Sequence, residues 1–115
     1  MLSKQQLGAA GERRAERYLA DLGYGFVAAN YRTRYGEIDL IMRDGPTLVF
    51  VEVKTRRARH QGYPEEAVTA LKLRHTVRVA AAYRTEHRHA GNWRVDVVSD
   101  SAAGMRHLEN VTAAL

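Results

Sequence analysis

Three charged side chains stand in apolar segments of the sequence, where they would lose hydration on folding. Asp39 is surrounded by isoleucine and leucine, and Glu52 and Lys54 end a run of apolar residues. Such groups need an ionic partner or a bound ion. On a strand, alternation would place Glu37 and Asp39 on one face of their strand, and it would likewise place Glu52 and Lys54 on one face of theirs.

The two segments that carry these residues should form a hairpin. Residues 37–42 and 48–54 have strand patterns, and residues 44–46 (Asp-Gly-Pro) between them are a tight-turn signal. Asp39 can then lie beside Glu52, and a hard divalent cation would relieve the repulsion of the two carboxylates. An Asp, Glu and Lys set of this kind serves metal-assisted phosphodiester cleavage. The alternative is a structural ion-pair cluster at the end of the sheet.

A third acid is expected from the first helix. Apolar residues at steps of three and four over residues 5–22 predict an amphipathic helix. Glu12 flanks its apolar stripe, and Glu16 lies one turn further on. We favour Glu12 as the acid that reaches the sheet, whereas Glu16 could equally pair with a neighbouring arginine such as Arg13 or Arg17.

The other elements complete a small mixed sheet. Ser3 is the expected N-cap of the first helix, and Gly23 is its expected stop. The further predicted elements are a strand over 24–35, a helix that Pro64, Glu65 and Glu66 open and that runs to about Thr85, a strand over 93–98, and a weaker strand over 105–111. Right-handed crossover makes the strand at 93–98 parallel to the one at 48–54. The prediction is an α/β fold with an α-β-β-β-α-β core and a helix on each face of the sheet.

The length of 115 residues predicts a single domain, with a core over about 3–98 and a C-terminal edge strand and tail over 99–115. The absence of cysteine excludes disulfides, thiolate zinc sites and a cysteine nucleophile. No apolar run approaches the ~20 residues of a membrane span. The first residues contain no apolar signal core, so we expect no membrane association and a cytoplasmic location.

The chain is basic, with a net charge of +5 and a pI near 9.9. Three of its 18 basic residues are lysines, which leaves 15 arginines, and arginine suits phosphate oxygens. Residues 55–62 form a basic segment, and Lys72 and Arg74 could line a phosphate-facing helix edge, although a solvated helix face would look the same. The residues expected to bind nucleic acid are Arg56, Arg57, Arg59, Lys72 and Arg74.

Two further polar features have structural interpretations. Asp96 alternates with valines and is interpreted as a hydrogen-bond acceptor within the fold rather than as a further site acid. The histidines show no spacing typical of metal ligands, and His107 is interpreted as a surface residue.

Several blocks of the sequence resemble the YraN family of small bacterial proteins. They include Gly11-Glu12, the block Gly-Glu-Ile-Asp-Leu-Ile at residues 36–41 and the block Val-Phe-Val-Glu-Val-Lys at residues 49–54. The similarity extends to about Val98. That family is similar to the PD-(D/E)XK nuclease superfamily, which includes archaeal Holliday junction resolvases and has a restriction endonuclease-like fold.

The resemblance implies a role for each candidate residue. Asp39 and Glu52 would be the metal-binding acids, Lys54 the signature lysine, and Glu12 the first-helix acid, although resolvase-like spacing could select Glu16. Ile38 stands where the superfamily has proline. The Val53 carbonyl would complete a site for Mg²⁺ or Mn²⁺, with Glu12 contributing directly or through water.

The expected function is that of a metal-dependent endonuclease acting on structured or damaged DNA. Lys54 would position or help to deprotonate the attacking water, and arginines of residues 55–62 would clamp the backbone. A symmetric substrate would favour a homodimer. The alternatives are a nucleic-acid-binding module of nuclease ancestry that acts with a partner without cutting, and an adaptor whose basic face binds an acidic protein.

Overall fold

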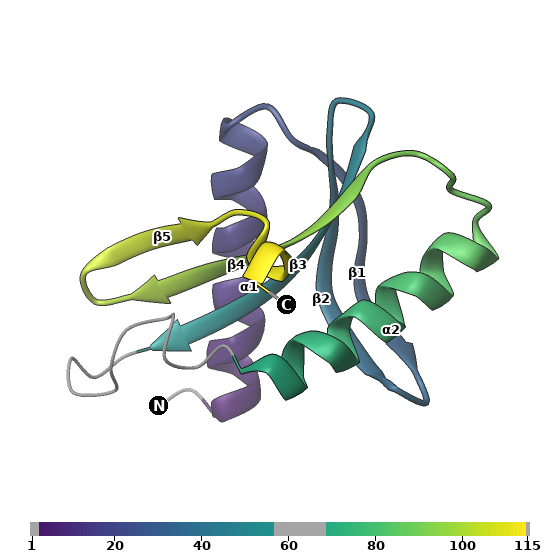
Figure 1. Ribbon diagram of the computed structural model, residues 1–115. Coiled ribbons are helices and arrows are strands. Elements are labelled where there is room, and N and C mark those ends of the chain that lie inside the picture. Colours follow the sequence, from purple (N-terminus) through teal and green to yellow (C-terminus); the bar gives the residue numbers. More distant parts are fainter. Residues whose placement is uncertain (1–2, 57–68, 115) are drawn as a thin grey trace.

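The computed structural model describes residues 3–56 and 69–114, without the side chains of residues 4, 56 and 114. The elements in chain order are α1 (Lys4–Asp21), β1 (Gly25–Thr33), β2 (Gly36–Asp44), β3 (Thr47–Arg56), α2 (Ala70–Glu86), β4 (Trp93–Ser101), β5 (Gly104–Leu108) and the 3₁₀ turn η3 (Val111–Ala114) (Figure 1). The strands form one sheet in the order β1-β2-β3-β4-β5. Only β3 and β4 are parallel among these neighbours, and the predicted mixed α/β sheet is confirmed.

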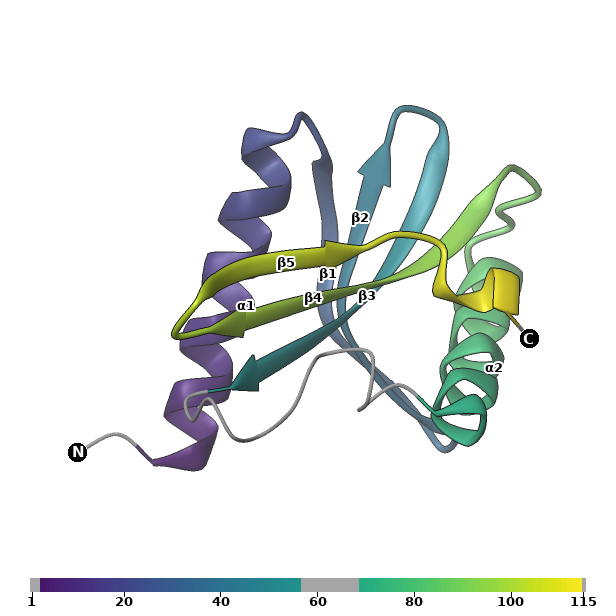
Figure 2. The same ribbon diagram turned by 60° about the vertical axis from the view of Figure 1, so that its left-hand side comes forward.

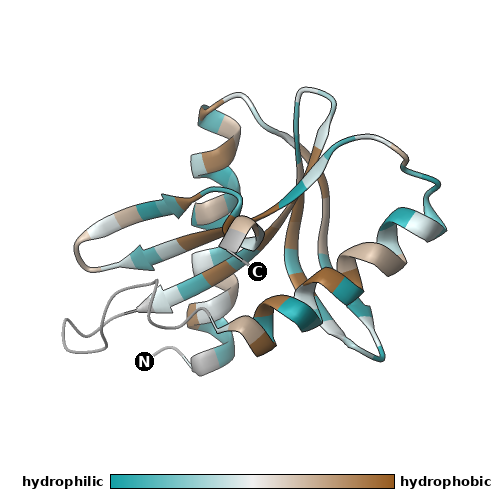
Figure 3. Ribbon diagram, in the orientation of Figure 1, coloured by the Kyte–Doolittle hydropathy of each residue, from teal (hydrophilic) through white to brown (hydrophobic). Residues whose placement is uncertain are grey.

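The sheet lies between the two helices (Figure 2). Along β3, Val49 and Val51 pack toward α1, whereas Phe50 packs toward α2. All three side chains are fully buried, as expected for a central strand covered on both faces. Hydrophobic residues accordingly run along the middle of the sheet (Figure 3). The sheet is thus a rigid base from which the charged strand ends project.

The ends of α1 follow the predicted signals. The Ser3 hydroxyl accepts from the backbone N–H of Gln6, and the Gln6 side chain accepts from the backbone N–H of Ser3, which makes a capping box. Gly23 follows the C-cap with a φ of +96°, a backbone conformation that other residues rarely adopt.

The start of α2 differs from the prediction. Thr69 has extended backbone and is the N-cap, since its hydroxyl accepts from the backbone N–H of Lys72. The helix therefore begins at Ala70, and the expectation that Pro64 opens it is wrong. The Thr69 side chain is of a type suited to capping. Glu65 and Glu66, like Pro64, lie outside the described residues.

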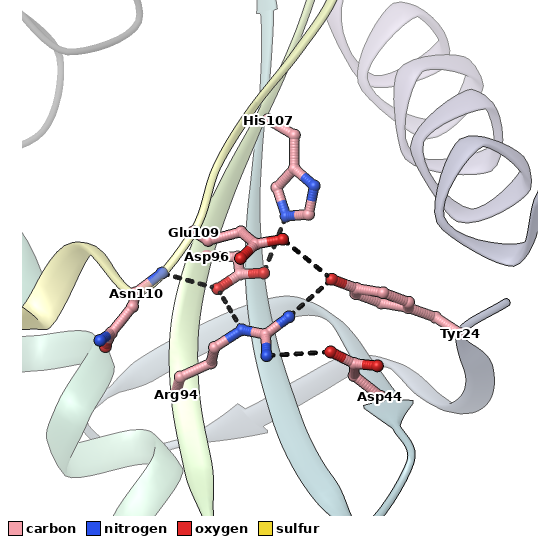
Figure 4. A network of polar contacts seen from close by, with 7 residues as sticks. All are labelled: Tyr24, Asp44, Arg94, Asp96, His107, Glu109 and Asn110. Carbon is pink, nitrogen blue, oxygen red and sulfur yellow. Dashed lines mark hydrogen bonds and ion pairs between the residues drawn. The ribbon is translucent and has the colours of Figure 1, made fainter. Parts of the chain in front are cut away.

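The C-terminal segment is held by a polar network around the fully buried Asp96 (Figure 4). The Asp96 carboxylate accepts from Arg94 Nε at 3.0 Å, from the Asn110 backbone N–H at 2.9 Å and from His107 Nε2 at 2.8 Å. Burial acts to raise the pKa of Asp96, but these hydrogen bonds outweigh it and lower that pKa. The structural interpretation of Asp96 is confirmed.

The same network corrects two expectations about the tail. His107 is not a surface residue, because only 7% of its side chain is exposed. The predicted strand over 105–111 ends at Leu108, because Asn110 has a φ of +52° and gives its N–H to Asp96. Sequence alternation alone could not show that a buried aspartate on β4 would bind these two residues.

Candidate functional site

Asp39 lies where β2 and β3 separate. The antiparallel pairing of these strands ends at Leu40 and Val51, so Asp39 and Glu52 occupy the next positions. Instead of backbone pairing there, Asp39 Oδ2 accepts from the Val53 backbone N–H at 2.7 Å. The sheet thus opens at the predicted acids, and a side-chain carboxylate takes the place of a backbone acceptor.

Glu52 and Lys54 face α2 from the end of β3. Lys54 Nζ lies 2.9 Å from Glu52 Oε1, and both side chains are largely buried. A small pocket of about 20 Å³, about the space of one water, lies against them and is lined also by Lys72, Leu73, Thr76, Val95 and Val97. Burial acts to lower the pKa of Lys54, but the ion pair with Glu52 outweighs it and raises that pKa. Lys54 is therefore a cation at neutral pH.

Asn30 joins the first helix to the start of β2. With its amide nitrogen turned toward the two carboxylates, Asn30 Nδ2 donates to Glu12 Oε1 at 3.1 Å and to Glu37 Oε1 at 2.9 Å. Asn30 has a φ of +54°, which asparagine tolerates better than most residues. Glu37 also lies 3.4 Å from Arg32 Nε. One amide thus holds two acids, from α1 and β2, close together.

Burial and neighbouring charges raise the pKa of two acids of this region, Asp39 and Glu12. Burial and the charge of Glu52 raise the pKa of Asp39 to about 7, against the hydrogen bond from Val53, and the charges of Glu12 and Glu37 add to the effect. Burial and the charges of Glu37 and Glu52 also raise the pKa of Glu12. We call Glu12, Glu37, Asp39 and Glu52 the acid cluster.

The side chains of the acid cluster are not arranged around a single point. Within residues 3–56 and 69–114, no three His, Asp or Glu side chains are gathered closely enough to hold one metal ion as they stand. Glu52 is engaged by Lys54, and Glu12 by Asn30. The donor chemistry nevertheless suits a hard cation, because carboxylates that repel one another are stabilised by a divalent ion.

The two candidate acids of α1 have different surroundings. Glu12 reaches Asn30 and contributes to the raised pKa of Asp39. Glu16 makes no hydrogen bond or ion pair within the part of the chain that the structure describes. The geometry therefore favours Glu12 over Glu16 as a member of the site.

The predicted nucleic-acid-binding residues are placed only in part. Lys72 and Arg74 are exposed on α2, and Lys72 borders the pocket beside Lys54. Arg57 and Arg59 lie outside the described residues, as does the side chain of Arg56.

The sequence did not identify Asn30 and Glu37 as site residues. Strict alternation would place Glu37 on the same strand face as Asp39, which was a usable signal. No sequence signal identified Asn30, because its role depends on a left-handed backbone conformation within β1.

Close packing at Gly11 sets the position of Glu12. A Cβ atom on Gly11 would lie 2.2 Å from Thr55 Oγ1 and 3.6 Å from Asp100 Oδ2, so only glycine lets α1 approach β3 this closely. Arg14, one turn further along α1, donates from Nε to Asp100 Oδ2 at 2.8 Å. Two contacts next to Glu12 therefore fix the helix against the sheet.

Gly11→Ala is expected to destabilise the protein by about 1–3 kcal/mol, because the added methyl group overpacks the contact with Thr55. The double variant Gly11→Ala/Thr55→Ala should recover much of this loss, since it removes the hydroxyl that the methyl group meets. Chemical denaturation measures both. Equal stability of Gly11→Ala and the parent protein would contradict this account of the packing.

Asn30→Asp is expected to destabilise the protein at about pH 8 by up to about 1 kcal/mol, because it replaces the shared donor with another carboxylate at an exposed position. Asn30→Gly is the matched control, since glycine accepts the positive φ and adds no charge. Denaturation curves should show Asn30→Asp as the less stable of the two. The prediction fails if the two variants are equally stable.

Neither helix among the described residues combines the length and apolarity that crossing a membrane requires.

Comparison with known sequences identifies relatives over most of the chain. A protein of Beutenbergia cavernae named UPF0102 protein is 48% identical over 117 residues, covering 96% of this chain and 99% of its own length. A UPF0102 protein of Nocardia farcinica is 52% identical over 99 residues, covering 84% of this chain and 76% of its own. A UPF0102 protein of Symbiobacterium thermophilum is 54% identical over 79 residues, covering 69% of this chain and 67% of its own length.

A family model described as "Uncharacterised protein family UPF0102" matches residues 11–99. The match spans Gly11 and Glu12 on α1, the whole acid cluster, and β4 as far as Ser99. It confirms the resemblance to the YraN family. The chain belongs to the UPF0102 family.

Proposed function

We propose that this protein is a divalent-metal-dependent nuclease that hydrolyses phosphodiester bonds in structured or damaged DNA. The observation that carries the proposal is Asp39. Its carboxylate lies at the separation of β2 and β3, its pKa is raised by burial and by three neighbouring acids, and a largely buried lysine stands on the next strand. Acids gathered in this way destabilise the folded protein, which a purely structural role would not require.

The acid cluster supplies hard oxygen donors, and it fits Mg²⁺ or Mn²⁺ in chemistry. Asp39, Glu52 and the Val53 carbonyl would hold the ion, with Glu12 contributing directly or through water. When bound, the ion would polarise the scissile phosphate and make a bound water more acidic. To hold the metal ion, Glu52 would have to give up its ion pair with Lys54, because one carboxylate cannot bind both cations closely.

The protein's own cations would act on the phosphate. Lys54 is charged, largely buried and adjacent to Asp39, so it would position the attacking water and stabilise charge that develops on the phosphate. Lys72 borders the same pocket and would bind a neighbouring backbone oxygen. A homodimer would match a substrate with two-fold symmetry.

The test is incubation with a panel of branched, nicked and single-stranded DNAs in Mn²⁺, with gel analysis of the products. The parent protein should cut at least one substrate, and Asp39→Ala should cut none while still binding. Asp21→Ala, which removes an exposed acid of α1, is the matched control and should cut normally. Equal cleavage by Asp39→Ala and the parent protein would refute the proposal.

The present side-chain contacts favour one second candidate, a nucleic-acid-binding module that does not cut. Lys54 is engaged by Glu52, and Asn30 engages Glu12, so each acid already has a partner within the protein. This candidate predicts salt-dependent DNA binding with no product in Mg²⁺ or Mn²⁺.

A further inference from the structure

A pair of arginines converges on one partly buried tyrosine at the turn between β1 and β2. Arg34 and Tyr35 are the two residues of this turn, since Thr33 pairs with Gly36. Arg34 donates to the Tyr35 hydroxyl at 2.8 Å, and its guanidinium carbon lies 5.0 Å from the ring centre. The guanidinium carbon of Arg78, on α2, lies 4.4 Å from the same centre. One aromatic side chain thus holds two cations close together.

These two cations have no acidic partner among the residues that the structure describes. Arg14 and Arg94, by contrast, are paired with Asp100 and Asp96. Two guanidiniums held together without a carboxylate repel each other, and an anion relieves that repulsion. Guanidinium groups bind phosphate oxygens well because their donors form a planar fork.

The arginine pair lies at the turn that leads directly into the part of β2 that carries Glu37 and Asp39. Gly36 follows Tyr35 and packs against α2, since a Cβ on Gly36 would lie 3.8 Å from Val79 Cγ2. Glu37 and Asp39 come next on β2, so Asp39 is roughly 13 Å from Tyr35 along the strand. The β1–β2 turn lies beside α2 in both ribbon views (Figures 1 and 2). A single nucleic-acid strand could therefore span both places.

The surface beside the pair has room for a nucleotide. An open depression of about 520 Å³ is lined by Tyr35, Arg78, Ala81, Ala82, Thr85 and Glu86. The two alanine side chains are short, so they leave space above α2 for a sugar or a base. Glu86 is the acid that lines this depression, and its carboxylate accepts a hydrogen bond from the Tyr31 hydroxyl at 3.1 Å.

We propose that Arg34, Tyr35 and Arg78 form a subsite that binds a backbone phosphate of the nucleic acid, away from the phosphate that is cut. The inference rests on the proposed function for its partner, a nucleic acid. Tyr35 is a positioning residue, since its hydroxyl and ring hold the two guanidiniums in place. Arg74, one helical turn before Arg78 and also exposed, extends the basic surface along α2.

The experiment measures binding in the absence of metal, so that cleavage plays no part. A fluorescein-labelled four-way DNA junction is titrated with the protein in EDTA over a salt series, and fluorescence anisotropy gives the affinity. Arg34→Gln/Arg78→Gln should weaken binding and lower the slope of log affinity against log salt by about 1–2, because phosphate contacts are lost. Tyr35→Phe should weaken binding a few-fold, since only the hydroxyl is removed.

The matched control is Arg17→Gln/Arg43→Gln, which removes the same charge from exposed positions on α1 and β2. If this control lowers the salt slope as much as Arg34→Gln/Arg78→Gln, the subsite is refuted. If the parent protein binds no DNA, both the subsite and the proposed function are refuted. DNA binding that shows the expected slope change, without cleavage in Mn²⁺, supports the subsite and refutes only the nuclease.

Discussion

Asp39→Asn is expected to stabilise the metal-free protein at about pH 8 by up to about 4 kcal/mol, and to change its stability little at about pH 4. Burial and the charge of Glu52 raise the pKa of Asp39 from 3.8 to about 7. Asparagine removes the buried charge, and its side-chain oxygen can still accept from the Val53 backbone N–H. The upper value corresponds to a shift of about 3 pKa units at 1.36 kcal/mol each.

The direction of this pH effect on stability follows from proton binding to Asp39. Between about pH 4 and 7 the folded state holds a proton on Asp39 that the unfolded state has released, so this group stabilises the fold most at low pH. That stabilisation is lost as the pH rises through about 7. The raised pKa of Glu12 acts in the same direction, and the informative quantity is therefore the difference between the variant and the parent protein.

Urea denaturation in EDTA at about pH 4 and about pH 8 gives the free energies of unfolding. Asp21→Asn, on the exposed face of α1, is the control and should show no comparable gain. If Asp39→Asn is less stable than the parent protein at the higher pH, the carboxylate is a structural ion-pair member and the strained acid cluster is refuted.

Lys54→Met is expected to lower the rate of metal-dependent DNA cleavage by about 10²–10³-fold. The variant removes the largely buried cation that pairs with Glu52, and it leaves Glu52 free to bind a metal ion. Metal affinity should therefore be kept or increased while the rate of the chemical step falls. Single-turnover cleavage and Mn²⁺ titration, measured on the same variant, separate the two effects.

Lys72→Met is the matched control, because Lys72 borders the same pocket from α2. It should weaken DNA binding and leave the single-turnover rate at saturating protein within a few-fold of the parent rate. A Lys54→Met protein that cuts as fast as Lys72→Met would show that Lys54 has only a structural ion pair with Glu52.

Much of the fold could be predicted from local signals. Ser3 and Gly23 bound α1, and the turn at residues 44–46 joins β2 to β3 in a register that ends at Leu40 and Val51, one residue before Asp39 and Glu52. The start of α2 could not be predicted in this way, because Pro64 and Thr69 are both helix-start signals and only the fold selects Thr69.

The contacts of the site were less accessible to sequence reasoning. Alternation placed Glu52 and Lys54 on one face, where they form an ion pair. The bond from Val53 to Asp39 requires the strands to separate, and the bridge from Asn30 to Glu12 and Glu37 requires a positive φ on β1. Both depend on long-range geometry rather than on local residue patterns.

The central claim is that the acid cluster binds a divalent metal ion through Asp39 and Glu52. The direct measurement is a titration with Mn²⁺ at about pH 8, followed by the loss of the free-ion electron paramagnetic resonance signal. The parent protein should take up Mn²⁺, and Asp39→Asn and Glu52→Gln should each lose most of that affinity. Uptake by Asp39→Asn equal to that of the parent protein, or no uptake by the parent protein, would contradict the claim.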